Sequence, residues 1–139
     1  MSIKIFYDVT GYKYNGWKKL QILINRIIEE GKMVPGEINF IITSDEKLRS
    51  INVEFLEHDY YTDVITFNYN VNEKVSGEVY LSIDTVKENA HLYNVSLYSE
   101  ITRVMIHGIL HLIGYDDKTV EEKYLMRKKE DYWLGILGE

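Results

Sequence analysis

The stretch around which this chain is organised reads His107-Gly108-Ile109-Leu110-His111-Leu112-Ile113-Gly114-Tyr115-Asp116-Asp117. Two histidines four residues apart on a helix project from one face, where both can bind a single metal ion. Gly114 is suited to end that helix in a left-handed turn, which lets Asp116 or Asp117 fold back toward the two imidazoles. Two histidines and a carboxylate leave an open coordination position for water, as in a catalytic zinc site.

Two features of this stretch have a second interpretation. His107 and His111 also fit hydrogen-bonded core residues of an apolar helix, although their spacing and the carboxylates that follow favour a metal site. Metalloproteases of the His-Glu-x-x-His type carry their general base at the position of Gly108, so that base is missing here. Gly108 indicates either close approach of a substrate or neighbouring segment, or tight helix packing.

The composition is that of one globular domain, which we expect to span residues 1–139. The chain contains no cysteine, so any metal must be bound by His, Asp or Glu, and a reducing cytoplasm is the expected compartment. No signal peptide and no apolar run long enough to span a bilayer are visible, and we expect no membrane association. A net charge of −6 argues against a protein that coats nucleic acid by neutralising phosphates.

Hydrophobic periodicity predicts an α+β fold with a small four-stranded mixed sheet and about five helices. The expected strands are residues 3–7, 37–43, 64–69 and 77–81, and the short connection between the last two favours an antiparallel pair. The expected helices are 17–31, one that ends near 57, 84–93, 97–114 and 120–137. We expect the helices to cover one face of the sheet, with 97–114 as the central buried helix that carries the metal motif.

Local sequence patterns predict the cap or the exposed and buried side chains of three of these helices. Thr43 and Glu46 have the spacing of a capping box at the start of the second helix. The side chains expected on its buried face are Leu48, Ile51, Asn52 and Phe55. The helix 84–93 has few apolar residues and should be largely exposed, whereas the last helix should dock through Tyr124, Leu125, Trp133, Ile136 and Leu137. The charges in and before that last helix predict a solvated face, with Lys118, Lys123, Arg127, Lys128 and Lys129 balanced by Glu121, Glu122, Glu130 and Asp131.

The chain resembles the YbeY family of single-strand-specific metallo-endoribonucleases, which act in bacterial ribosomal RNA maturation and ribosome quality control. The family signature His-Gly-x-Leu-His-Leu-x-Gly-Tyr-Asp-His is met at every fixed position from His107 to Asp116. The family segments Asp-x-Pro-Thr-Asp-Val-Leu-Ser-Phe and Gly-Asp-Ile are similar to residues 59–67 and 77–79.

The resemblance implies three metal ligands, His107, His111 and Asp117, although the family has histidine at the third position. It implies one Zn²⁺ per chain, with Ni²⁺ and other divalent ions open, because aspartate is a harder ligand than imidazole. A functional arginine of the family falls on Leu56. The candidate cations to replace it are Arg49, His58 and Lys118.

The resulting hypothesis is an endoribonuclease in which metal-activated water hydrolyses single-stranded RNA. The resemblance implies that the target is the 3′ end of small-subunit ribosomal RNA. His107, His111 and Asp116 are the expected catalytic residues, and Asp116 or Asp63 would orient water or ligands. Tyr60, Tyr61 and Tyr115 suit either base stacking or packing. Because the chain is acidic, a ribosome or a ribosome-assembly protein is an expected partner. The alternatives are a metal-dependent hydrolase of another substrate and a non-catalytic, ribosome-associated metal-binding protein.

Overall fold

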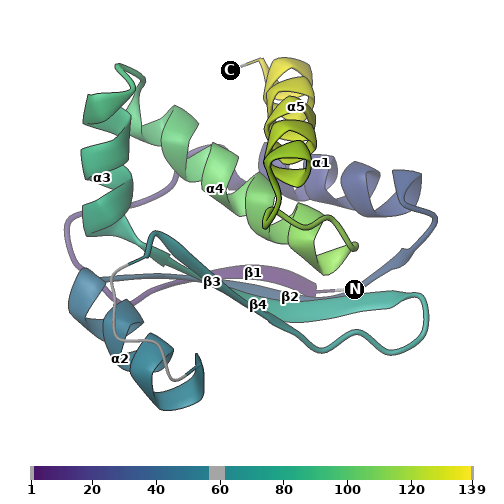
Figure 1. The fold of residues 1–139 in the computed structure, drawn as a ribbon, viewed down its shortest axis with the longest axis horizontal. Coiled ribbons are helices and arrows are strands. Elements are labelled where there is room, and N and C mark those ends of the chain that lie inside the picture. The colour runs from purple at the N-terminus through teal and green to yellow at the C-terminus, as the bar shows by residue number, and fades with distance from the viewer. Residues whose placement is uncertain (1, 57–61, 139) are drawn as a thin grey trace.

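A four-stranded mixed sheet lies between helices in the computed structural model, which describes residues 2–56 and 62–138 (Figure 1). Its strands are β1 (Ser2–Tyr7), β2 (Val34–Thr43), β3 (Val64–Asn68) and β4 (Lys74–Ser82). They lie in the order β1-β2-β4-β3. β2 is parallel to both β1 and β4, whereas β3 pairs antiparallel with β4 and forms one edge. The predicted α+β class, the mixed sheet and the antiparallel pair are confirmed.

Helices cover both faces of the sheet rather than one. Those found are α1 (Trp17–Glu30), α2 (Asp45–Leu56), α3 (Ile83–Leu92), α4 (Leu97–Leu112) and α5 (Val120–Leu137). Four of them lie on one side of the sheet, and α2 lies alone on the other (Figure 1). There Leu48 and Ile51 pack against Ile65, with Phe67 and Tyr80 beside them. The expectation of a single covered face was wrong for α2, because β3 and β4 present apolar side chains on both faces.

The central helix is α4, as predicted, and it contacts α1, α3, α5, β3 and β4. It lies close to β4 because glycines occupy the contact on both elements. A Cβ at Gly108 would be 2.7 Å from Val79 Cγ1, and one at Gly77 would be 2.8 Å from Leu112 Cδ2. Tight packing is therefore the reason for glycine at position 108, and the alternative of close substrate approach is not needed.

Two predictions about individual residues of α2 were wrong. Its start is capped by Ser44, whose Oγ accepts a hydrogen bond from the Lys47 backbone N at 3.3 Å, and not by Thr43. Thr43 ends β2 and donates its hydroxyl to Asp8 Oδ2 at 3.0 Å. Phe55 is 61% exposed, although its spacing predicted a buried side chain. Thr43 is still part of β2, so the residue that caps α2 is the next one along the chain.

The outer helices follow their predicted bounds closely but differ in which side chains they bury. α3 is largely exposed, as predicted. α5 docks through Trp133 and Leu137, whereas the exposed side chains of α5 include Tyr124, Leu125 and Ile136, which we expected to dock. The residues that α5 buries are Met126, Glu130, Trp133, Leu134 and Leu137. Of the helices described, none combines the length and apolar character needed to cross a bilayer.

We predict that Gly108→Ala destabilises the protein by about 1 kcal/mol. Overpacking a buried contact costs about 1–3 kcal/mol, and the gain in helix propensity returns about 1 kcal/mol. Gly135→Ala is the matched control, because this glycine also lies inside a helix and a Cβ there meets no atom within 4 Å. Urea unfolding should show Gly135→Ala stabilised and Gly108→Ala destabilised. Equal stabilisation of both variants would contradict the packing argument.

Candidate metal centre

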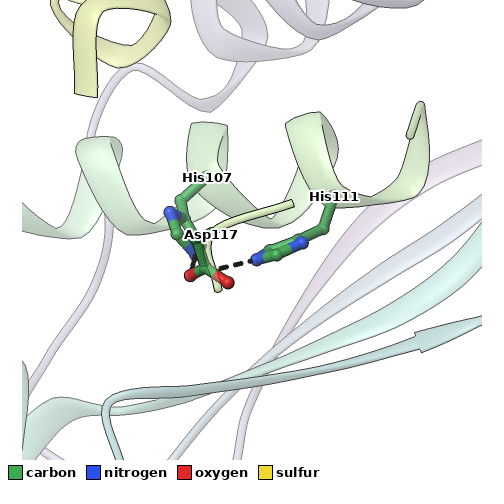
Figure 2. A group of neighbouring side chains, drawn as sticks. All are labelled: His107, His111 and Asp117. Carbon is green, nitrogen blue, oxygen red and sulfur yellow. Dashed lines mark ion pairs between the residues drawn. The ribbon is translucent and has the colours of Figure 1, made fainter. Parts of the chain in front are cut away.

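Three side chains from two segments converge beside α4 (Figure 2). Asp117 Oδ2 lies 3.3 Å from His107 Nε2 and 3.4 Å from His111 Nε2. The two imidazoles are one helical turn apart, and their ring centroids are separated by 4.6 Å. Within the described part of the chain, this is the group of His and carboxylate side chains able to hold a metal ion. The structure thus brings together the three predicted ligands.

Asp117 reaches the histidines because both ends of its loop are held by hydrogen bonds. At the end of α4, Tyr115 N donates to Leu110 O at 3.0 Å, and Gly114 has a φ of 111°, which turns the chain back. At the start of α5, Thr119 and Glu122 form a capping box. A capping box was predicted at Thr43 and not here, although the same Thr-x-x-Glu pattern occurs at Thr119.

The imidazole of His107 is held by a buried carboxylate behind it. His107 Nδ1 lies 2.6 Å from Glu130 Oε2, and Arg103 donates to Glu130 Oε1 at 2.9 Å and to Asp131 Oδ1 at 2.7 Å. Burial alone would lower the pKa of His107, but the Glu130 hydrogen bond and the surrounding carboxylates outweigh it and raise that pKa. The hydrogen bond assigns the proton to Nδ1 and directs the Nε2 lone pair toward Asp117.

The geometry of these donors fits a divalent ion. With the proton on Nδ1, Nε2 of His107 has a lone pair and faces a carboxylate oxygen of Asp117. Both atoms are hydrogen-bond acceptors, so they need a proton or a cation between them. In a tetrahedral site with bonds of about 2.1 Å, two ligand atoms lie about 3.4 Å apart. The distances from Asp117 Oδ2 to His107 Nε2 and to His111 Nε2 match this separation between ligand atoms. The set of two imidazoles and one carboxylate suits zinc and neighbouring transition metals.

The three side chains line a cleft of about 800 Å³. Its walls come from α2, β3, α3, α4 and α5, and the residues that line it include Leu56, Asp63, Tyr93, Glu100, Lys123 and Arg127. Asp63 lies just before β3, and burial raises the pKa of its carboxyl group, while the charge of His107 acts in the opposite direction. Burial likewise raises the pKa of Glu100. The metal centre therefore lies in a cleft whose carboxylates are close to the two histidines.

Other predicted site residues lie elsewhere. Asp116 is exposed and does not line the cleft, so its catalytic role stays a prediction without support from position. Leu56 does line the cleft, where the resemblance implies arginine, but neither Arg49 nor Lys118 does. Tyr115 packs against the core, in keeping with the packing alternative. The predictions for His58, Tyr60 and Tyr61 fall outside the described residues.

Glu130 is the main residue of this site that sequence reasoning missed. It was assigned to the solvated face of the last helix, yet it is 5% exposed and contacts His107. A signal was available, because Met126, Glu130, Trp133 and Leu137 follow the three- and four-residue spacing of one helical face. A charged residue within an apolar stripe indicates a buried partner.

Comparison with known proteins identifies the family. The family described as Endoribonuclease YbeY matches residues 12–138. A protein from Cytophaga hutchinsonii named Endoribonuclease YbeY is 43% identical over 97% of this chain and 95% of its own length. A protein of the same name from Flavobacterium psychrophilum is 47% identical over 79% of this chain and 78% of its own. The solution structure of TM1509 from Thermotoga maritima aligns with a TM-score of 0.66 at 29% identity, over 97% of this chain and 88% of that one. The chain that carries this His-His-Asp centre therefore belongs to the Endoribonuclease YbeY family.

Proposed function

We propose that this protein is a metal-dependent endoribonuclease that hydrolyses phosphodiester bonds of single-stranded RNA. The observation that carries the proposal is the convergence of His107 Nε2, His111 Nε2 and Asp117 Oδ2 on the wall of an open cleft. Relatives that share this chain over most of their length are named endoribonucleases. Zn²⁺, one per chain, is the proposed ion.

A divalent ion bound by these residues would supply Lewis acidity, which lowers the pKa of water toward neutrality and polarises a phosphodiester. The other tasks fall to the protein. Glu130 holds the proton on His107 Nδ1, so that Nε2 is available as a ligand. Asp63 lines the same cleft, and burial makes its carboxylate a stronger base than an ordinary aspartate, which suits it to orient water and accept its proton.

The proposed substrate is ribosomal RNA in the cytoplasm, with the 3′ end of the small-subunit RNA as the target. The protein carries a net charge of −6, and the cleft itself is rich in carboxylates. Such a molecule has little general attraction for a polyanion. Delivery of the RNA by the ribosome or by a ribosome-assembly protein fits this charge better than free diffusion along RNA.

The proposed metal ligands can be tested by substitution. We predict that His111→Ala and Asp117→Ala lose bound metal and all cleavage of single-stranded RNA, because each removes one of three ligands. Asp117→His should retain both metal and cleavage, since imidazole can replace the carboxylate. Metal content by mass spectrometry and cleavage of a labelled RNA should be measured on one preparation of each variant, with a chelator control.

Three outcomes of this experiment contradict the proposal. Cleavage by metal-free His111→Ala would exclude the mechanism. Wild-type protein that holds metal but cleaves a peptide or ester and not RNA would indicate another hydrolase. Metal binding and ribosome binding without any cleavage would indicate a non-catalytic binding protein.

The hydrogen bond behind His107 gives a separate prediction. Glu130→Gln keeps the size of the side chain but replaces the carboxylate oxygen with a neutral amide, which weakens the acceptor for Nδ1–H. We expect the affinity for Zn²⁺ to fall by about 10–100-fold, as for other partners of metal-bound histidines. Competition with a chromogenic chelator measures this directly. Asp131→Asn is the control, since Asp131 contacts Arg103 without touching His107, and unchanged affinity in Glu130→Gln would contradict the assigned role.

A further inference from the structure

One wall of the cleft combines an aromatic ring with two cations. Tyr93, at the end of α3, is 53% exposed, and Lys123 and Arg127 lie one helical turn apart on α5. All three line the cleft that holds the metal centre. The guanidinium carbon of Arg127 lies 5.9 Å from the centroid of the Tyr93 ring, so the two helices present these groups side by side. None of the three was singled out as a site residue from the sequence.

The side chain of Arg127 lies near the metal centre and still has donors available. Its Nη1 is 3.9 Å from Glu130 Oε1, and the other oxygen of Glu130 contacts His107. Arg103 is the other cleft arginine in the described residues, but it forms two short ion pairs and its side chain is only 16% exposed. The Arg127 side chain is 54% exposed, and its ion pair among the described residues is the long contact with Glu130, beside its contact with the Tyr93 ring. Arg127 is therefore the arginine that can bind a ligand without losing a short ion pair.

We propose that Tyr93, Lys123 and Arg127 form a nucleotide subsite, which holds the nucleotide next to the bond that is cleaved. A base stacks on the exposed face of Tyr93, and Arg127 and Lys123 bind the phosphates on either side of it. An aromatic side chain can stack only on a base that has left its duplex, so this wall selects single strands. The inference rests on the proposed function, and it adds which residues recognise the RNA. The subsite also supplies cations in a cleft where Leu56 replaces the family arginine.

A purely structural role for Arg127 predicts different results. Burial raises the pKa of Glu100, and the charge of Arg127, like that of Arg103, opposes this rise, so Arg127 also offsets negative charge in the cleft. If that were its whole role, Arg127→Ala would change stability or metal affinity and leave RNA binding unaffected. The chain offers a matched control on the same helix, where Lys128 Nζ lies 5.2 Å from the Tyr124 ring. This second cation–aromatic pair is exposed and does not line the cleft.

The experiment measures binding of a fluorescent single-stranded RNA by anisotropy, with chelator present to stop cleavage, over a range of salt concentrations. We expect Tyr93→Ala to weaken binding about tenfold and Tyr93→Phe to retain it, because stacking needs only the ring. Arg127→Ala and Lys123→Ala should each reduce the slope of log affinity against log salt by about 0.7, the value for one contact with a single-strand phosphate. Tyr124→Ala and Lys128→Ala should match the wild type.

An abasic scan of the RNA sharpens the test. At one position, removal of the base should weaken binding by the wild type but not by Tyr93→Ala, while binding of duplex RNA should be the same for both proteins. The inference is overturned if the wild type binds no RNA, if the cleft variants match the control variants, or if Arg127→Ala keeps the full salt slope. Binding that follows these expectations without cleavage on metal loading would support the subsite and contradict the proposed nuclease.

Discussion

The close contact between α4 and β4 determines where the two histidines of the metal centre lie. Gly108 allows the helix to rest on Val79, and Gly77 allows the strand to accept Leu112. Because a buried interface has no room for an added methyl group, these contacts define both the height of α4 above the sheet and its rotation. The face that carries His107 then turns away from β4, toward the cleft bounded by edge strand β3 and helix α5.

That placement concentrates negative charge around two histidines. Asp63 before β3, Glu100 on α4 and Glu130 on α5 line the cleft with Asp117. Arg103 neutralises Glu130 from behind and Asp117 faces the two histidines, but Asp63 and Glu100 have no ion pair among the described residues. Mutual repulsion and burial raise the free energy of the site without a bound cation, so binding of a divalent ion should also stabilise the fold. Metal affinity and stability are linked in this architecture.

The same cleft must also receive a polyanion, which its acidic centre repels. Carboxylates surround the histidines, while Lys123 and Arg127 of α5 add exposed cations to one wall of the same cleft. Aromatic stacking adds attraction that does not depend on charge. A protein with a net charge of −6 can thus recognise RNA through a small local surface, provided that the RNA is single-stranded where it enters.

The sequence by itself determined what depends on neighbours along the chain. Helical spacing was enough to pair His107 with His111, and Gly114 was enough to predict that Asp116 or Asp117 turns back toward them, since both effects act over a few residues. The family resemblance selected Asp117. The α+β class, the strands and the bounds of α5 followed from local periodicity in the same way. Tertiary structure decided which faces dock: α2 on the far side of the sheet, Phe55 exposed, and Glu130 buried behind a histidine 23 residues away. Those outcomes depend on contacts between distant segments, because an amphipathic helix encodes that it has a buried face but not which partner covers it.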